Sequence, residues 1–403
     1  MMIKDQTVVS VSLVTAVCLL GNSMLYVTLP LYWQEAGLNS LWEVSIILSV
    51  NRVVRLPLNA FVGWLYSKIK IRPALVAAVA LAAAATWGYG IFSGFKMWLI
   101  LRTLWGISWS LLKLGGFLAV ISEAGEDDRG RLMGKYNGLH RLGDFFGLLA
   151  GGVLTGILGF KTTLVLFGFF IFLVLPVVFF LVPNYRVFDT KNIKAESGLN
   201  LSFAVIRVMA GGLIIALLFE GIVASTLSLF VARHYQESIF IAGFCITAAA
   251  LSGFLLGIRW LWEPFLASLI GGWSDRQENR EVLFLPFLAL GAIGFFITAL
   301  DFPLPLPVWI GVVLLLMVTA TALVTLSDSL ASDIAKQKFS VRIIAIYTIV
   351  LDIGAALGPF MAYQLITLQT GLFYPYLLGG ILLLTVLVLW IVPPAFRKQT
   401  LFK

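Results

Sequence analysis

The chain has 403 residues, of which 60% are hydrophobic and only 12% are charged, and its formal net charge at pH 7 is +8. A soluble domain carries about twice that charged fraction, so the composition excludes an ordinary soluble protein and indicates that lipid is the main solvent. The basic balance would suit a nucleic-acid partner, but the cations gather between apolar runs. We therefore interpret the charge as a topology signal and expect no nucleic-acid ligand.

Twelve apolar runs are long enough to cross a membrane as helices, because a spanning helix needs about 20 mostly apolar residues. The runs lack the period-two alternation of membrane barrel strands. The predicted fold is an all-α polytopic membrane protein. Its helices are expected at roughly 8–33, 41–66, 74–94, 97–121, 131–158, 162–182, 202–232, 239–270, 282–300, 306–329, 342–367 and 371–393.

The first run is far longer than the apolar part of a secretory signal, and no small-residue cleavage site follows it, so we expect a retained helix. With the N-terminus in the cytoplasm, most Lys and Arg residues fall in cytoplasmic loops and tails, and Lys96, Lys161 and Arg233 fall outside. This asymmetry predicts that both termini are cytoplasmic. We expect an integral protein of a bacterial inner (plasma) membrane.

One segment between the predicted helices, Pro183 to Asn200, is both long and polar, and it divides the chain nearly in half. We predict an N-terminal six-helix bundle at 1–182, a cytoplasmic linker at 183–201 and a C-terminal six-helix bundle at 202–403. Cys18 and Cys245 lie in apolar runs without metal-ligand spacing, so both are expected to be buried apolar residues.

The two halves contain related sequence. Arg131, Gly134, Tyr136, Gly143 and Gly147 align at a constant offset of 211 with Arg342, Ala345, Tyr347, Gly354 and Gly358. The loop from Gly63 to Arg72 matches the loop from Gly271 to Arg280 at an offset of 208. A duplicated membrane bundle is typical of secondary transporters.

These loops resemble the signature G-x-x-x-D-R/K-x-G-R/K-R/K of the major facilitator superfamily of secondary transporters. Ser67 and Lys70 depart from it in the first copy. The matching residues are Gly63, Lys68 and Arg72 in the first copy, and Gly271, Asp275, Arg276 and Arg280 in the second. The motif needs glycine for close helix approach, an acid to cap a facing helix and cations on the cytoplasmic side.

Two further helical motifs are similar to patterns of this family. The antiporter motif G-x8-G-x3-G-P-x2-G-G is matched by Gly134, Gly143, Gly147, Gly151 and Gly152, with Leu148 in place of the proline. In the second half, Pro359 follows Gly358 directly. Arg102 and Gly106 are similar to the R-x-x-x-G element near the outer face. The resemblance spans the whole chain and implies two pseudo-symmetric six-helix bundles that work by alternating access as a monomer.

Charged residues inside spanning helices require a partner or a water-filled space. In the first half cations are in excess: Arg52, Arg55, Arg102, Lys113 and Arg141, with the one acid Asp144. In the second half acids are in excess: Glu220, Glu263, Asp328 and Asp352, with the one cation Arg259. The resemblance implies that the second helix packs against the eleventh and the fifth against the eighth. Arg52 and Arg55 would then approach Asp352, and Arg141 and Asp144 would approach Glu263 and Arg259.

We predict that these charge pairs break and reform during transport, with Asp352 the first candidate for the coupling proton and Glu220 the next. Static ion pairing between the halves is the alternative. His140 could relay protons, although a packing role suits a single histidine as well.

The resemblance implies that the first, fourth, seventh and tenth helices line a central cavity. On the fourth helix, two cations and two indoles follow at spacings of 3, 4 and 4, which places them on one face. The predicted cavity residues are Asn22, Tyr26, Arg102, Trp105, Trp109, Lys113, Glu220 and Trp260. Lipid-facing or interfacial packing is the alternative for the tryptophans.

The sequence predicts a proton-coupled antiporter that exports an amphipathic organic anion, with protons and membrane lipid as its other partners. Export of cationic or zwitterionic drugs, proton symport for uptake and a lipid flippase of the same fold stay open. The sequence has no HExxH, GxSxG or Walker motif, so we expect neither an enzyme nor a bound metal or cofactor.

Overall fold

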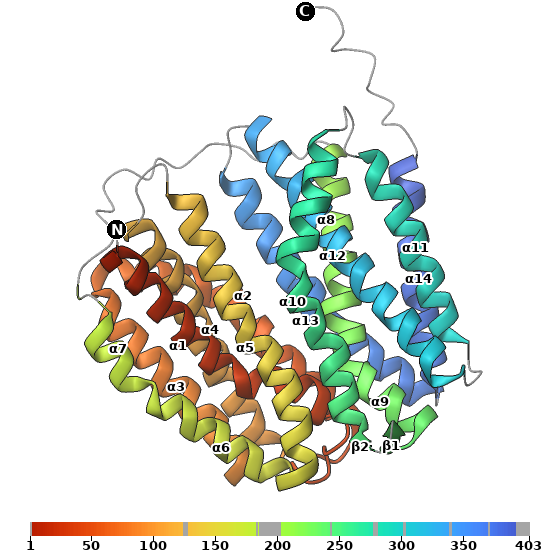
Figure 1. Cartoon of the computed structure of the whole chain (residues 1–403), viewed down its shortest axis with the longest axis horizontal. Helices are drawn as coiled ribbons and strands as arrows, with labels where there is room; N and C mark the ends of the chain where they lie inside the picture. The colour runs from red at the N-terminus through yellow and green to blue at the C-terminus, as the bar shows by residue number, and fades with distance from the viewer. Residues whose placement is uncertain are drawn as a thin grey trace, which may run out of the picture. The chain divides into compact units, whose positions relative to one another are not determined.

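The computed structural model describes residues 2–123, 128–182, 184, 203–241, 244–276, 281–300, 304–337, 341–369 and 371–391. Within these ranges, twelve helical spans are long and apolar enough to cross a membrane (Figure 1). The predicted all-α polytopic fold is confirmed.

The first six spans comprise seven helices, because a short break divides the sixth span. The helices are α1 (Met2–Thr28), α2 (Leu41–Lys68), α3 (Ile71–Ile91), α4 (Phe95–Glu123), α5 (Arg129–Leu158), α6 (Phe160–Leu173) and α7 (Leu175–Leu181). The break falls at Val174, directly before the first turn of α7, which contains Pro176. Proline has no N–H to continue a preceding helix but fits the first turn of a new one.

The seventh span contains a π-helix between two α-helices. Its residues form α8 (Phe203–Ile215), the π-helix η2 (Ala216–Val223) and α9 (Ala224–Tyr235) without interruption. The remaining elements are β1 (Ser238–Ile241), β2 (Phe244–Thr247), α10 (Ala248–Asp275), α11 (Glu281–Ala299), α12 (Leu306–Gln337), α13 (Val341–Gln369) and α14 (Phe373–Ile391).

The eighth span begins later than predicted. We expected a helix from residue 239, but 238–247 contain the antiparallel pair β1 and β2, in which Ile239 lies opposite Ile246. Both strands are rich in β-branched and aromatic residues, which favour strands, and hydropathy alone does not separate the two structures. Cys245 is exposed in β2, so its predicted burial is wrong, whereas Cys18 is buried as expected.

By its internal contacts the chain divides into two compact units. Unit 1 comprises the described residues of Met1–Ile193 and Ala224–Leu261, and unit 2 those of Lys194–Val223 and Trp262–Lys403. The first half of α10 therefore groups with the first six spans. The division into bundles at 1–182 and 202–403, joined by a linker, stays a prediction.

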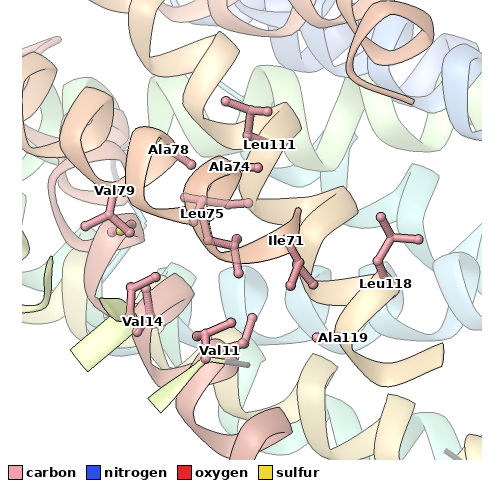
Figure 2. Packing of buried hydrophobic residues seen from close by; sticks show 14 of the residues in the cluster. Val11, Val14, Ile71, Ala74, Leu75, Ala78, Val79, Leu111, Leu118 and Ala119 are labelled. Atoms are coloured by element: carbon pink, nitrogen blue, oxygen red, sulfur yellow. The ribbon is translucent and has the colours of Figure 1, made fainter. Parts of the chain in front are cut away.

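The core of unit 1 is built around α3, whose small residues allow close packing. Ala74, Ala78 and Ala82 are buried along one face of α3, next to apolar residues of α1 and α4. Figure 2 shows part of this cluster, with Val11 and Val14 from α1 near Leu75 and Val79 of α3. In lipid the packing of side chains, rather than expulsion of water, holds helices together, so these small contacts determine the arrangement of unit 1.

The repeated glycines mark the tightest helix contacts in both units. In unit 1, a Cβ at Gly143 or Gly147 would meet the backbone of Ala16 or Leu20 in α1. In unit 2, a Cβ at Gly354 would meet the backbone of Leu213 in α8, and one at Gly358 the backbone of Leu217 in η2. The sequence repeat therefore corresponds to a repeated helix pair, the first span with the fifth and the seventh with the eleventh.

Substitution of Gly143 by Ala is expected to destabilise unit 1 by about 1–3 kcal/mol, because the added methyl group meets the Ala16 backbone and α1 and α5 must separate. Gly138→Ala is a matched control in the same helix, since no atom of the described residues lies within 4 Å of its added Cβ. The control should be neutral or stabilising by up to about 1 kcal/mol. Thermal unfolding in detergent measures both, and equal melting temperatures would contradict the predicted contact.

Candidate functional site

A polar network joins α1, α2 and α4 inside unit 1. Arg102 is fully buried, and its guanidinium donates to Asn22 Oδ1 (2.8 Å) and to the carbonyl oxygen of Ile47 (3.0 Å). Asn51 Nδ2 donates to the same Asn22 oxygen (3.4 Å). A Cβ at Gly106 would lie 2.8 Å from the Asn51 carbonyl oxygen, so glycine is required here for α2 to approach α4. The R-x-x-x-G element thus fastens three helices together.

Tyr26 and Arg52 form a second polar contact between α1 and α2. Arg52 Nε donates to the Tyr26 hydroxyl (3.3 Å), and Tyr26 is buried. Arg55 and Arg102 also lie close enough to Tyr26 to act on it electrostatically. Three predicted site cations therefore gather around one phenol oxygen, which can orient an arginine without neutralising its charge.

The predicted aromatic face of α4 is formed as expected from the spacing. The indoles of Trp105 and Trp109 stack with centroids 5.8 Å apart and an interplanar angle of 12°. Trp109 meets the ring of His140 edge-on at 6.2 Å, and His140 Nδ1 lies 3.0 Å from the Tyr136 carbonyl oxygen. Lys113, one turn beyond Trp109, is half-buried and acts electrostatically on His140. The stack links α4 to α5 at the middle of both helices.

A chain of contacts around Asp144 connects α1, α5 and α10. Ser23 Oγ donates to Asp144 Oδ1 (2.6 Å), and Arg141 Nη1 lies 3.4 Å from Asp144 Oδ2. The Arg141 guanidinium carbon lies 4.1 Å from the centroid of the Trp260 ring, and that of Arg259 lies 5.1 Å from it. One carboxylate, two guanidinium groups and one indole therefore meet at mid-helix depth.

The α5–α10 contact that carries this chain is close. A Cβ at Gly152 would lie 2.5 Å from the Ala249 carbonyl oxygen, and a Cβ at Gly253 would meet the Leu148 carbonyl oxygen. Glu263 belongs to unit 2, so its pairing with Arg141 or Asp144 stays a prediction, as does the pairing of Arg52 and Arg55 with Asp352.

In unit 2, Glu220 lies inside the π-helix η2 and is half-buried. A Cβ at the next residue, Gly221, would lie 2.6 Å from Gly358 Cα and 3.3 Å from Pro359 Cδ. Asp352 is half-buried on α13, six residues before Gly358. π-Helical turns occur frequently at functional sites. Both candidate coupling acids of unit 2 therefore lie within two turns of its closest helix contact.

Tyr347 of α13 is the repeat counterpart of Tyr136. Its hydroxyl donates to Ser327 Oγ or to Asp328 Oδ1, each 2.9 Å away, and Glu220 is near enough to act on it electrostatically. The predicted acid Asp328 is thus attached to α13 by a tyrosine, a contact that the sequence did not indicate.

The conformational motif residues have few contacts within their own units. A Cβ added at Gly63 or Gly271 would meet no neighbouring element of its own unit within 4 Å, and the close helix approach expected at these glycines stays a prediction. Arg72 Nε donates to the Val182 carbonyl oxygen (2.6 Å). Lys68, Asp275 and Arg276 are exposed, and Arg280 lies outside the described residues.

Sequence reasoning missed two polar residues. Ser23 holds Asp144, and its position in the polar stripe of the first helix beside Asn22 was an available signal. Arg207 in α8 is buried, bonds Glu281 Oε1 (2.7 Å) and lies 4.1 Å from the Trp390 ring centroid. Arg207 lies within an apolar run of the sequence. The rule that a charge inside a spanning helix needs a partner would have singled this residue out.

Outside the membrane spans, Tyr32 lies in the turn region after α1. Its ring stacks on Phe160 with centroids 5.7 Å apart. Burial raises the pKa of the Tyr32 hydroxyl, and the carboxylates of Glu237 and Glu35 raise that pKa further. Tyr32 is therefore a neutral packing group across the physiological pH range.

Residues 11–265 match the family model described as the Major Facilitator Superfamily. Over 240 residues the chain is 25% identical to the uncharacterized MFS-type transporter YcaD of Salmonella heidelberg (strain SL476), covering 59% of this chain and 60% of that protein. It is 26% identical over 171 residues to YcaD of Salmonella typhi, covering 41% and 43%. The chain thus spans 60% or less of the length of these relatives.

Solved transporter structures share the fold at low sequence identity. A bacterial homolog of the human lysosomal transporter Spinster matches with a TM-score of 0.72 and 13% identity, covering 96% of this chain and 95% of that one. A POT family transporter in complex with 5-aminolevulinic acid matches with a TM-score of 0.76 and 11% identity, covering 96% and 94%. A peptide transporter POT in complex with sulfate has a TM-score of 0.75 at 15% identity, covering 96% and 93%.

The match to the family model covers more than half of the chain, and the twelve spans have the fold of these transporters. Accordingly, the chain belongs to the major facilitator superfamily and is an integral membrane protein.

Proposed function

We propose that this protein is a proton-coupled antiporter that exports an amphipathic organic anion across a bacterial inner membrane by alternating access. The observation that carries the proposal is the contact chain from Ser23 through Asp144 and Arg141 to Trp260. It places a carboxylate that can take a proton beside a guanidinium that can take an anion. Protonation of Asp144 would weaken its hold on Arg141 and free the guanidinium for an anion, so proton binding and anion binding are linked through the same pair of side chains.

The cationic excess of the first half favours an anionic substrate. Lys113 and Arg141 of this half lie at mid-span depth, where a charge needs a partner or water. Two fold relatives were solved with 5-aminolevulinic acid and with sulfate, both of which carry an acidic group. Glu220 favours the second candidate substrate, a cationic or zwitterionic drug, because its carboxylate supplies a negative charge inside the π-helix η2.

Both six-helix bundles take part in the proposed cycle. We infer that 1–182 and 202–403 rock about the membrane midplane as a monomer with cytoplasmic termini, while Asp352 and Glu220 exchange protons. The glycines of α5 and α13 let the backbones of paired helices touch without intervening side chains. A contact of this kind supports the sliding of one helix along the other within each pair.

Flux measurements in proteoliposomes test the proposal. An outward-directed anion flux driven by an inward proton gradient is the expected result. Flux in the same direction as the proton gradient would replace export with symport. Movement of labelled lipid without solute flux would replace it with a flippase.

Substitution of Lys113 by Ala is expected to weaken binding of organic anions by roughly 10-fold or more, because a charge-assisted contact is lost, and to change binding of organic cations little. Lys161→Ala is the control, since Lys161 lies in the first turn of α6, away from mid-span depth, and donates to Ser93 Oγ (3.0 Å). Calorimetric titration measures both ligand classes. Equal losses for anions and cations would assign Lys113 a structural role.

A further inference from the structure

The twelve tryptophans fall into two groups by depth. Trp33 lies in the segment after α1, and seven others lie within about one turn of a helix end: Trp42, Trp64, Trp87, Trp98, Trp273, Trp309 and Trp390. Trp105, Trp109, Trp260 and Trp262 instead lie ten or more residues from either end of α4 or α10. At about 1.5 Å per residue this is 15 Å or more inside the helix.

Deep tryptophans need an explanation that interfacial ones do not. Tryptophan favours the membrane interface because its indole N–H can bond water or headgroups there. Trp105 is buried, and its Nε1 has no hydrogen-bond partner among the described residues. An amphipathic ring placed at this depth therefore loses a hydrogen bond that an interfacial position would keep.

The three deep indoles of unit 1 lie among polar groups and do not face lipid alone. Trp109 stacks on Trp105 and touches His140, while Trp260 lies under the guanidinium groups of Arg141 and Arg259. Trp109 and Trp260 are only partly buried, so part of each ring surface is accessible. His140 and Arg141 are consecutive, which joins the two indole sites through one turn of α5.

We infer that these indoles form a subsite for a planar aromatic ring that carries a carboxylate or another acidic group. A flat ring can stack on an indole, and its acidic group can meet the cations next to it; both contacts strengthen where water is excluded. This inference rests on the proposed function and specifies its substrate class as an aromatic acid, in place of any amphipathic anion.

Three probes separate ring shape from charge. They are 2-naphthoate, which is flat and anionic, decahydro-2-naphthoate, which has the same charge on a saturated skeleton, and 2-naphthylmethylammonium, which is flat and cationic. Titration calorimetry of the full chain in detergent should give a Kd for 2-naphthoate roughly 3- to 10-fold lower than for its saturated analogue.

The variant Trp109→Leu should lose that preference for the flat anion, because it removes the ring and keeps an apolar side chain. Trp87→Leu is the matched control, since Trp87 is 51% exposed near the end of α3, and it should keep the preference. If Trp109→Leu does not give a monodisperse protein, Trp260→Leu tests the same point at the other indole.

Equal affinity for the two anions in the wild type, or an unchanged preference in Trp109→Leu, would overturn the aromatic subsite and leave anion transport standing. Binding of the flat cation with no binding of either anion would overturn the aromatic-acid subsite and would also reject the proposed anionic substrate. Failure of all three probes to bind would overturn the inference for aromatic acids, whereas the flux measurements would still decide the proposed function.

Discussion

Substitution of Asp352 by Asn is expected to abolish pH-driven transport and to leave substrate binding largely intact. Asn keeps the size and polarity of the side chain but cannot exchange a proton or attract an arginine. Asp352 is half-buried on α13, less than two turns before Gly358, where α13 meets the backbone of η2. A change in its charge can therefore act on the closest helix contact of unit 2.

The experiment compares flux driven by a pH gradient with exchange of labelled for unlabelled substrate at equal pH. A coupling acid should lose the first and retain much of the second. Asp333→Asn provides the matched control, a partly buried carboxylate of α12 four residues from its end. Wild-type pH-driven flux in Asp352→Asn would remove Asp352 from the mechanism and transfer the assignment to Glu220 or Asp144.

Substitution of Arg102 by Met is expected to destabilise unit 1 by about 1.5–3 kcal/mol, because it removes the hydrogen bonds that a charged guanidinium donates to two neutral acceptors. The change removes the side-chain donor to the Ile47 carbonyl oxygen and leaves Asn22 Oδ1 with its longer bond from Asn51. The measurement is the melting temperature in detergent, together with the yield of monodisperse protein.

The control for Arg102 lies on the same helix. Lys96→Met removes a cation at the exposed start of α4 and should change the melting temperature little. Arg102→Lys should fall between the two, because an ammonium group cannot reach two acceptors in the fixed directions of a guanidinium. If Arg102→Met melts with the wild type but binds anions more weakly, the residue acts on substrate and not on the fold.

The parts of the fold that depend on length and hydropathy could be predicted from the sequence. Twelve predicted runs correspond to twelve spans, and the repeated glycines that the sequence singled out lie at close helix contacts, although the sequence did not indicate which helices they bring together. The 3, 4 and 4 spacing also placed Trp105 and Trp109 together correctly. These features follow from helix geometry, which is local and regular.

Other features depend on contacts that no local pattern encodes. The residues of β1 and β2 are as apolar as residues that begin a spanning helix, so hydropathy could not distinguish strands from a helix here. Ser23 is an ordinary helix residue until α5 brings Asp144 against it. The π-helix η2 has no distinctive composition, and it lies where the seventh span packs closely against Gly358. Tertiary contacts decide each of these cases.

The two copies of the repeated helix pair differ in which helix carries an acid. The contact partners Ala16 and Leu213, like Leu20 and Leu217, differ by 197 positions, and the same shift carries Ser23 to Glu220. Asp144 corresponds at the repeat offset of 211 to Ala355. At these two corresponding positions, unit 1 has a serine on the first span and an acid on the fifth, whereas unit 2 has an acid on the seventh span and an alanine on the eleventh. The repeated helix pair is therefore symmetric in its glycine contacts and asymmetric in which helix bears the carboxylate at these positions.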